Sequence, residues 1–240
     1  VPIDKEGNSF TPQIPLDEQA RNWIIEVAKR GDLGKSNGAC LWVPLATEPA
    51  SSKAKAAAKA DRRTSLANRQ KTTATSLQTH RVLLVRLASE ADKAAPSEKA
   101  YVDACKAVAK QLDEADISSA VSLLQAALPS DKDLAWASSR LVLACREQQY
   151  RFDVFKREAS KQTKASAGKG LQHLFLAVDP RKSASVDTAI AHAMALANGM
   201  DLTKDLGNTP PNICTPEFLA EKALALSKSH KIQVQVLEDR

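Results

Sequence analysis

The stretch GNTPPNICTP (207–216) lies between two segments of helical periodicity and holds several residues that restrict the backbone. Gly207 is typical of a residue that ends a helix, because glycine adopts at little cost the conformation that a helix end requires. The two adjacent prolines restrict the residues before them to extended conformations. Thr215 is a good helix N-cap, and Pro216 suits the first helical position. We therefore predict a rigid corner between two helices rather than a flexible linker.

The elements on either side of this corner are predicted from the spacing of apolar residues. Segment 183–206 places them on one face at intervals of three and four, as an amphipathic helix does. A second helix is expected from Thr215 to about His230, with the Glu217 carboxylate near its positively charged end. Residues 231–239 alternate between polar and apolar side chains, which is typical of a half-buried strand.

Upstream of residue 180, apolar runs that suit strands alternate with segments of helical periodicity. Such alternation predicts an α/β fold, with a mixed and largely parallel sheet that carries helices on both faces. Residues 1–15 are expected to form a loop or the remnant of a strand. The expected strands are 39–45, 80–88, 116–124 and 171–178, and the expected helices are 17–29, 97–112 and 131–155.

Asp179 and Pro180 mark a turn, and we place the main domain boundary there. Residues 1–180 would form an N-terminal α/β domain, with an insertion at about 46–79 that is rich in Ala, Lys, Ser and Thr. Residues 181–240 would hold the connecting helix and the first helix and strand of a second α/β domain. A single strand cannot close a parallel sheet, because parallel pairing needs a further crossover connection. The second domain is therefore expected to be incomplete in this chain.

Positive charge is concentrated in one segment of a chain whose formal net charge is +6. Residues 51–81 contain eight lysines and arginines and one acid, Asp61, and eight minus one gives a local charge of +7. Clustered bases neutralise nucleic-acid phosphates, so non-specific DNA binding is one interpretation. The segment has no aromatic residue for base stacking, and a solvated insertion is the other interpretation.

The cysteines and histidines form no recognisable site. Cys40, Cys105, Cys145 and Cys214 are widely spaced and include no CxxC pair, so free thiols in a reducing cytosol are the simplest interpretation. The four histidines form neither an HExxH motif nor a pair at helical spacing. No apolar run is long enough to span a membrane, and the sequence does not begin with a secretory signal. We therefore expect a cytoplasmic protein without a membrane partner.

Two further patterns resemble sites but fail on spacing or context. GDLGKS (31–36) ends like a phosphate loop, but the first glycine of GxxxxGK[ST] would fall at Lys29, and a strand rather than a helix follows. We interpret it as a turn. Asp201 and Asp205 lie four residues apart on the same predicted helix with Lys204 between them, which favours a solvated face over metal binding. We therefore assign no catalytic, cofactor-binding or metal-binding residue.

The wider segment NGMDLTKDLGNTPPNICTPEFLAEKA (198–223) closely resembles the leucyl aminopeptidase family, the two-metal cytosolic aminopeptidases. That family has a helix ending in a Leu-x-Arg/Lys-Asp-Leu type run, then Asn-x-Pro-Pro-Asn, then Thr-Pro and another helix. KRGDLGKSNGACLWVPL (29–45), followed by RVLLVRL (81–87), is similar to the N-terminal domain of the family. The strand of that domain usually runs into Gly-Leu-Gly, where this chain has Arg86-Leu87-Ala88. The matching residues of the main motif are Asp205, Leu206, Asn208, Pro210, Pro211, Asn212, Thr215, Pro216, Leu219 and Ala220.

The resemblance implies a metallo-aminopeptidase that removes N-terminal residues, often leucine, from peptides. In the full-length family enzyme, carboxylates and a lysine hold two divalent ions (zinc, manganese or magnesium), which bind the substrate amino group and activate a bridging water. Ligand motifs of the types VGKG…FD and NTDAEGR do not occur before Arg240, so we expect this segment alone to bind no metal and to be inactive. The resemblance also implies a homohexamer, and some bacterial members bind DNA. A non-catalytic DNA-binding or assembly module is the alternative function.

Overall fold

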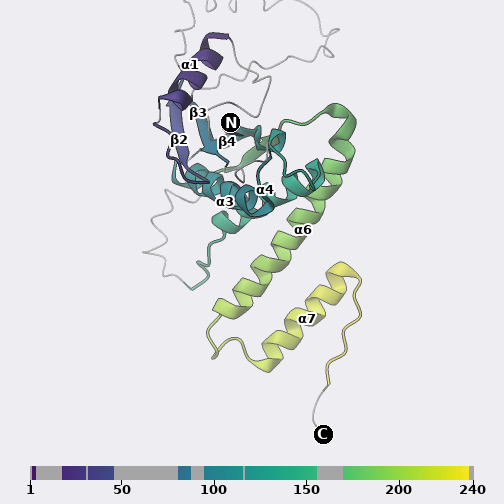
Figure 1. Ribbon diagram of the computed structural model, residues 1–240. Coiled ribbons are helices and arrows are strands. Elements are labelled where there is room, and N and C mark those ends of the chain that lie inside the picture. Colours follow the sequence, from purple (N-terminus) through teal and green to yellow (C-terminus); the bar gives the residue numbers. More distant parts are fainter. Residues whose placement is uncertain are drawn as a thin grey trace, which may run out of the picture.

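Strands and helices alternate along the chain in the computed structural model (Figure 1). The structure describes residues 2–3, 18–30, 32–45, 81–87, 95–115, 117–155 and 170–237, so the predicted insertion at 46–79 lies outside the described residues. The strands are β1 (Pro2–Ile3), β2 (Cys40–Pro44), β3 (Arg81–Arg86), β4 (Ser119–Ser122) and β5 (His173–Leu176). The helices are α1 (Glu18–Lys29), α3 (Glu98–Glu114), α4 (Leu134–Gln149), α6 (Ser183–Asn208) and α7 (Pro216–His230), with short 3-10 turns at Leu124–Ala126 and Pro180–Lys182.

Strand β3 is the centre of a three-stranded sheet with the order β1-β3-β2. It pairs in parallel with β1 and antiparallel with β2, so this sheet is mixed. Side chains of a strand point alternately to the two faces of the sheet. Val82 and Leu84 pack with the buried residues of α1, whereas Val85 and Leu87 join the core formed with α3 and α4. The sheet carries helices on both faces, as the sequence predicted for this α/β fold.

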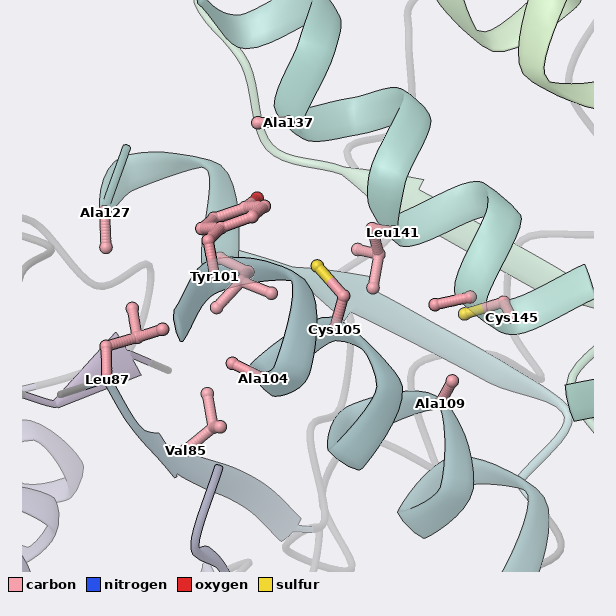
Figure 2. Packing of buried hydrophobic residues seen from close by; sticks show 12 residues of the cluster. Val85, Leu87, Tyr101, Ala104, Cys105, Ala109, Ala127, Ala137, Leu141 and Cys145 are labelled. Atoms are coloured by element: carbon pink, nitrogen blue, oxygen red, sulfur yellow. The ribbon is translucent and has the colours of Figure 1, made fainter. Parts of the chain in front are cut away.

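The larger core lies where α3 and α4 pack together over β3, and large side chains alternate there with small ones (Figure 2). Tyr101 and Leu141 are fully buried, Cys105 lies between the two helices, and Ala104 faces Val85 and Leu87. The aromatic rings of Tyr101 and Trp136 lie 5.5 Å apart and are tilted by 45°. Offset aromatic pairs of this kind add to the stabilisation that apolar burial provides.

Helix α4 ends earlier than its periodicity predicted. The backbone of Tyr150 leaves the helical region, with φ −58° and ψ 130°. The Arg151 guanidinium then donates hydrogen bonds to the carbonyl oxygens of Gln148 and Tyr150, at 2.6 and 2.9 Å. Basic side chains commonly satisfy the free carbonyl groups at a helix end in this way. The expected helix over 131–155 was therefore too long at its C-terminal end.

Strands β4 and β5 form a second, parallel pair within the predicted segments 116–124 and 171–178. Leu174 and Leu176 pack against the larger core. The opposite face of this pair remains accessible, with Val121 44% and Phe175 53% exposed. The parallel pairing agrees with the expected sheet, and the second pair is connected to the first sheet through the shared core.

Helix α6 leaves this core and carries α7 at its far end (Figure 1). Its most extensive contact with another element is with α4. The buried residues of α6 are Val186, Ala193 and Ala197, so the contact is made mainly through small side chains. By contrast, α7 has no buried residue.

The residue that ends α6 is Thr209 rather than Gly207. The helix continues through Gly207 to Asn208, so the prediction that this glycine terminates it is wrong. Thr209 is extended, with ψ 128°, because Pro210 follows it and disfavours helical backbone at the preceding position. The Thr209 N–H still donates to the Asp205 carbonyl oxygen at 3.0 Å, which closes the last turn.

The extended path predicted for this stretch holds at Thr209, but a turn begins at Pro211, where the prediction of an extended path is wrong. The Pro210 carbonyl oxygen accepts hydrogen bonds from the N–H groups of Ile213 and Cys214, each at 2.9 Å. Thr215 then begins α7, and its side chain accepts from the Phe218 N–H at 3.3 Å. A proline occupies the first helical position, as predicted. The corner is therefore held by hydrogen bonds as well as by proline rings.

Lys231 ends α7 in the left-handed conformation, with φ 55°. Residues 231–237 continue without pairing to any strand of the described chain. The strand predicted over 231–239 is therefore absent from these residues. Strand N–H and C=O groups need partners on a neighbouring strand, and none of the described strands lies beside this segment.

Candidate functional site

The described parts of the chain contain no group of three or more His, Cys, Asp or Glu side chains that could hold a metal ion. All four cysteines are free, as the sequence indicated, and Cys105 and Cys145 are buried. Burial raises the pKa of Cys145 to about 12 and that of Cys40 to about 11. A thiol with a raised pKa stays protonated at neutral pH and is a poor nucleophile. Neither cysteine is therefore activated for catalysis.

Charged and polar side chains gather instead between α4 and α6. Arg146 of α4 donates hydrogen bonds to the Asp201 carboxylate at 2.8 Å and to the Asn198 side chain at 3.1 Å. The side chains of Arg146 and Asp201 are 32% and 24% exposed, so this ion pair is only partly solvated. We define the α4–α6 polar cluster as Arg146, Tyr150, Asn198, Asp201, Asp205 and Asn208.

The Tyr150 hydroxyl forms the second part of this cluster. It donates to the Asp205 carboxylate at 2.9 Å and accepts from the Asn208 amide at 3.1 Å. The Lys204 ammonium lies 4.8 Å from the centre of the Tyr150 ring, within the range of a cation–π contact. Desolvation raises the pKa of Tyr150, and its hydrogen bond to Asp205 raises it further. The phenol is therefore a neutral hydrogen-bonding group at physiological pH.

A cavity of about 220 Å³ opens beside the cluster. Its charged lining groups already have partners: Arg146 pairs with Asp201, and the Arg151 guanidinium lies 2.9 Å from the Asp113 carboxylate. The cavity therefore has no unpaired acid, base or nucleophile with which to act on a substrate. The lining residues are Arg146, Gln149, Tyr150, Arg151, Asp201 and Asp205.

The interpretation of Asp201, Lys204 and Asp205 as a solvated face is wrong, because all three contact residues of α4 or Tyr150. Sequence analysis also missed Arg146 and Tyr150. One signal was available: Asp201 and Asp205 continue, at intervals of four, the face on which the expected apolar stripe lies. When polar residues continue an apolar stripe along one face of a helix, that face is expected to form polar contacts with a neighbouring element.

The segment that resembled a phosphate loop is a structural turn, as predicted. Its described part precedes β2, and the Arg86 side chain donates to the Gly34 carbonyl oxygen at 2.7 Å. Gly38 has a positive φ of 75° and donates its N–H to the Arg86 carbonyl oxygen at 2.8 Å. Arg86 is only 6% exposed, and its side chain ties the turn to the end of β3.

Most of the basic segment 51–81 lies outside the described residues, and Arg81 is its one described member. The Arg81 guanidinium lies 5.1 Å from the centre of the Trp42 ring and donates to the Ala115 carbonyl oxygen at 3.4 Å. No helix in the described residues is long and apolar enough to cross a membrane.

Residues 44–159 match the model of the N-terminal domain of the cytosol aminopeptidase family. The chain is 40% identical over 157 residues to a protein of Ralstonia pickettii (strain 12J) named "Probable cytosol aminopeptidase", covering 65% of this chain and 30% of that protein. A protein of the same name from Nitrosospira multiformis is 30% identical over 236 residues, which cover 98% of this chain and 39% of the relative. The chain thus matches only 30% and 39% of the length of these two relatives.

The structure also resembles a solved structure described as "Bottromycin maturation enzyme BotP in complex with Mn". The TM-score is 0.54 at 16% sequence identity, and the match covers 95% of this chain and 36% of that chain. A second structure of BotP gives a TM-score of 0.56 over 97% of this chain. At this level of identity the likeness concerns the fold alone.

Proposed function

The chain belongs to the cytosol aminopeptidase family, and we propose that it is a portion of a metal-dependent leucyl aminopeptidase that removes N-terminal amino acids from peptides. The observation that carries this proposal is the similarity to the Nitrosospira multiformis relative, which extends over 98% of this chain. That similarity runs through the N-terminal domain and across the corner at 207–216 that first suggested the family.

The two divalent ions that the resemblance implies, manganese or zinc, do not fit the residues described in this structure. The described chain offers no cluster of three potential metal ligands, and the charged groups that line the cavity beside the α4–α6 polar cluster already have partners. We therefore assign no catalytic step to these residues. The proposal is that the metal ligands belong to polypeptide beyond this segment, and that the segment alone is inactive.

The region from residue 181 onward supports the proposal of a second, incomplete domain after a first domain of residues 1–180. Leu219 and Leu224 of α7 are 44% and 42% exposed, and Ile232 is 48% exposed. Exposed apolar side chains of this size suit a segment that packs against further polypeptide. The unpaired 231–237 segment, with its alternating side chains, would then gain a neighbouring strand.

The decisive experiment compares this chain with a longer one. We would sequence the DNA beyond the Arg240 codon and express both the 240-residue chain and any continued open frame. Hydrolysis of leucine p-nitroanilide would be assayed with Mn²⁺ and with a chelator. We expect metal-dependent turnover by the longer protein and none by the 240-residue chain. Turnover by the short chain, or a stop codon directly after Arg240, would contradict the proposal.

Cytoplasmic location and assembly into a homohexamer are further parts of the same proposal. They rest on the family resemblance, and sedimentation of the longer protein tests the hexamer directly.

DNA binding by the basic segment is the second candidate function, and the local charge of +7 in residues 51–81 favours it. Binding through phosphates weakens steeply as the salt concentration rises, because the release of counterions from the DNA is then less favourable. The test measures duplex DNA affinity of the 240-residue chain over a range of salt concentrations. Its matched variant replaces Lys53, Lys55 and Lys59 by Gln. Absence of binding at low salt would exclude this function, whereas equal binding by the variant would exclude these lysines as the contact.

A further inference from the structure

One face of α6 makes two different kinds of contact along its length. From Val186 to Ala197 this face is buried, with Val186, Ala193 and Ala197 as its buried residues. After Ala197 the same face continues, at intervals of three and four residues, with Asp201, Asp205 and Asn208 of the α4–α6 polar cluster. The helix therefore changes from apolar packing to hydrogen bonding without changing the face that it presents to α4.

The hydrogen bonds between α4 and α6 form a ladder that runs along both helices. Residue numbers rise together in the two helices, so the helices point in the same direction. The pairs, in order, are Ser139 with the Ala189 carbonyl at 3.2 Å, Arg146 with Asp201 at 2.8 Å, and Tyr150 with Asp205 at 2.9 Å.

The polar contacts of this ladder fix the orientation of α6 more than they stabilise the fold. A partly exposed ion pair such as Arg146–Asp201 adds little to the free energy of unfolding. The Arg146 Nε atom is buried and has no hydrogen-bond partner among the described residues, which is itself unfavourable. Hydrogen bonds are directional, however, whereas contacts between alanines permit a helix to slide or rotate. The polar cluster therefore selects one placement among several that apolar packing allows.

Tyr150 can fix the orientation of α6 because its hydroxyl both donates a hydrogen bond to this helix and accepts one from it. It donates to Asp205 and accepts from Asn208, three residues further along the same face. Both partners lie within the motif that carries the family resemblance, at the C-terminal end of α6. A rotation of α6 about its axis would break both bonds.

We propose that Arg146 and Tyr150 are positioning residues, which set the register and angle of α6 on the N-terminal domain. Since α6 carries the 207–216 corner and α7 at its far end, these two side chains fix the direction in which the second domain is held (Figure 1). This consequence rests on the proposed second domain, but the contact itself does not depend on catalysis.

The test measures energy transfer within the folded 240-residue chain. All three tryptophans, Trp23, Trp42 and Trp136, precede α6 and serve as donors. A thiol-reactive acceptor is placed on Cys214 in the corner, in a Cys40→Ala background, because the other two cysteines are buried. Time-resolved donor decay gives the distribution of donor–acceptor distances, and this readout needs no peptidase activity.

We expect Tyr150→Phe and Arg146→Gln each to broaden this distribution at temperatures below the unfolding transition. Loss of one net hydrogen bond should raise the population of displaced conformers about fivefold. Asp205→Asn should keep the wild-type distribution, because its amide oxygen still accepts from the Tyr150 hydroxyl. A residue that only stabilised the fold would lower the unfolding midpoint and leave the folded-state distances unchanged.

The matched control is Thr203→Ala, since the Thr203 hydroxyl donates only within its own helix, to the Gly199 carbonyl oxygen at 2.9 Å. This variant should give the wild-type distance distribution. The proposal is overturned if Tyr150→Phe and Arg146→Gln leave the distribution unchanged, singly and together. It is equally overturned if Thr203→Ala broadens the distribution to the same extent.

Discussion

Leucines of this chain differ in burial, and burial decides what each contributes to stability. Leu141 of α4 is fully buried between α3 and α4, whereas Leu224 of α7 is 42% exposed. Truncating Leu141 to alanine leaves a cavity in a close-packed core. The same truncation at Leu224 removes a side chain that has solvent on one side.

We predict that Leu141→Ala lowers the free energy of unfolding by ~2–5 kcal/mol, the range for a buried leucine. Leu224→Ala, the matched control on another helix, should change it by less than ~0.5 kcal/mol. Urea denaturation followed by tryptophan fluorescence measures both values. Similar losses in the two variants would mean that α7 packs on the rest of this chain, contrary to its lack of buried residues.

At the scale of single elements, α7 depends on its own capping more than on packing. It has no buried residue, so its first turn is held mainly by the Thr215 side chain and the proline that follows. Hydrogen bonds from its own backbone N–H and from Thr215 lower the pKa of Glu217, so this carboxylate is ionised beside the positive end of the helix at neutral pH.

Thr215→Ala should therefore destabilise α7 by ~1 kcal/mol, the usual cost of losing a threonine N-cap. We expect faster hydrogen exchange of the amides in the first turn of α7, with no change in the protection of α3 or α4. Ser229→Ala is the control, because its hydroxyl bonds to the Ala225 carbonyl in the last turn of the same helix. Unchanged exchange at the first turn in Thr215→Ala would show that the cap is dispensable.

The α4 helix shows how tertiary contacts shift a predicted boundary. Its periodicity predicted a helix as far as residue 155, but Arg151 turns back onto the last carbonyl groups and Tyr150 leaves the helix to reach α6. Periodicity records which side chains can face a core. It does not record where a basic side chain ends the helix by binding its free carbonyls.

On the scale of the whole molecule, α6 packs on the N-terminal α/β unit. Val186, Ala193 and Ala197 are buried against the described chain, and the polar cluster ties α6 to α4. The domain boundary proposed near Pro180 lies before this helix, so the connecting helix belongs by packing to the unit that precedes it. The described residues after Asn208 bury few side chains, and α7 has none that is buried.

Two truncations test this assignment. A chain of residues 1–208 should have the same free energy of unfolding as the 240-residue chain, to within ~0.5 kcal/mol. A chain of residues 1–180 should lose ~2 kcal/mol or more, because it exposes the face of α4 that α6 covers and no longer buries Val186. Equal stability of the two truncated chains would place the boundary of the folding unit at Pro180 after all.

Local chemistry made much of the fold predictable from the sequence. The alternation of strands and helices, the cap at Thr215 and the turn before β2 each depend on residues close together in the chain. The same reasoning failed at Gly207, because the helix continues through this glycine and ends only at Thr209, the residue before the next proline. It failed again at residues 231–237 of the predicted strand, where the alternating pattern pairs with none of the described strands.

The sequence by itself determined the α/β class, the order of the elements and the family, since these follow from periodicity and from one short motif. Only the tertiary structure decided which polar residues have partners. Asp201 and Asp205 looked like a solvated face until folding brought them to Arg146 and Tyr150, each 55 residues away in the chain. Side-chain periodicity specifies which residues share a helix face. The packing of a second helix against that face determines which of them form hydrogen bonds.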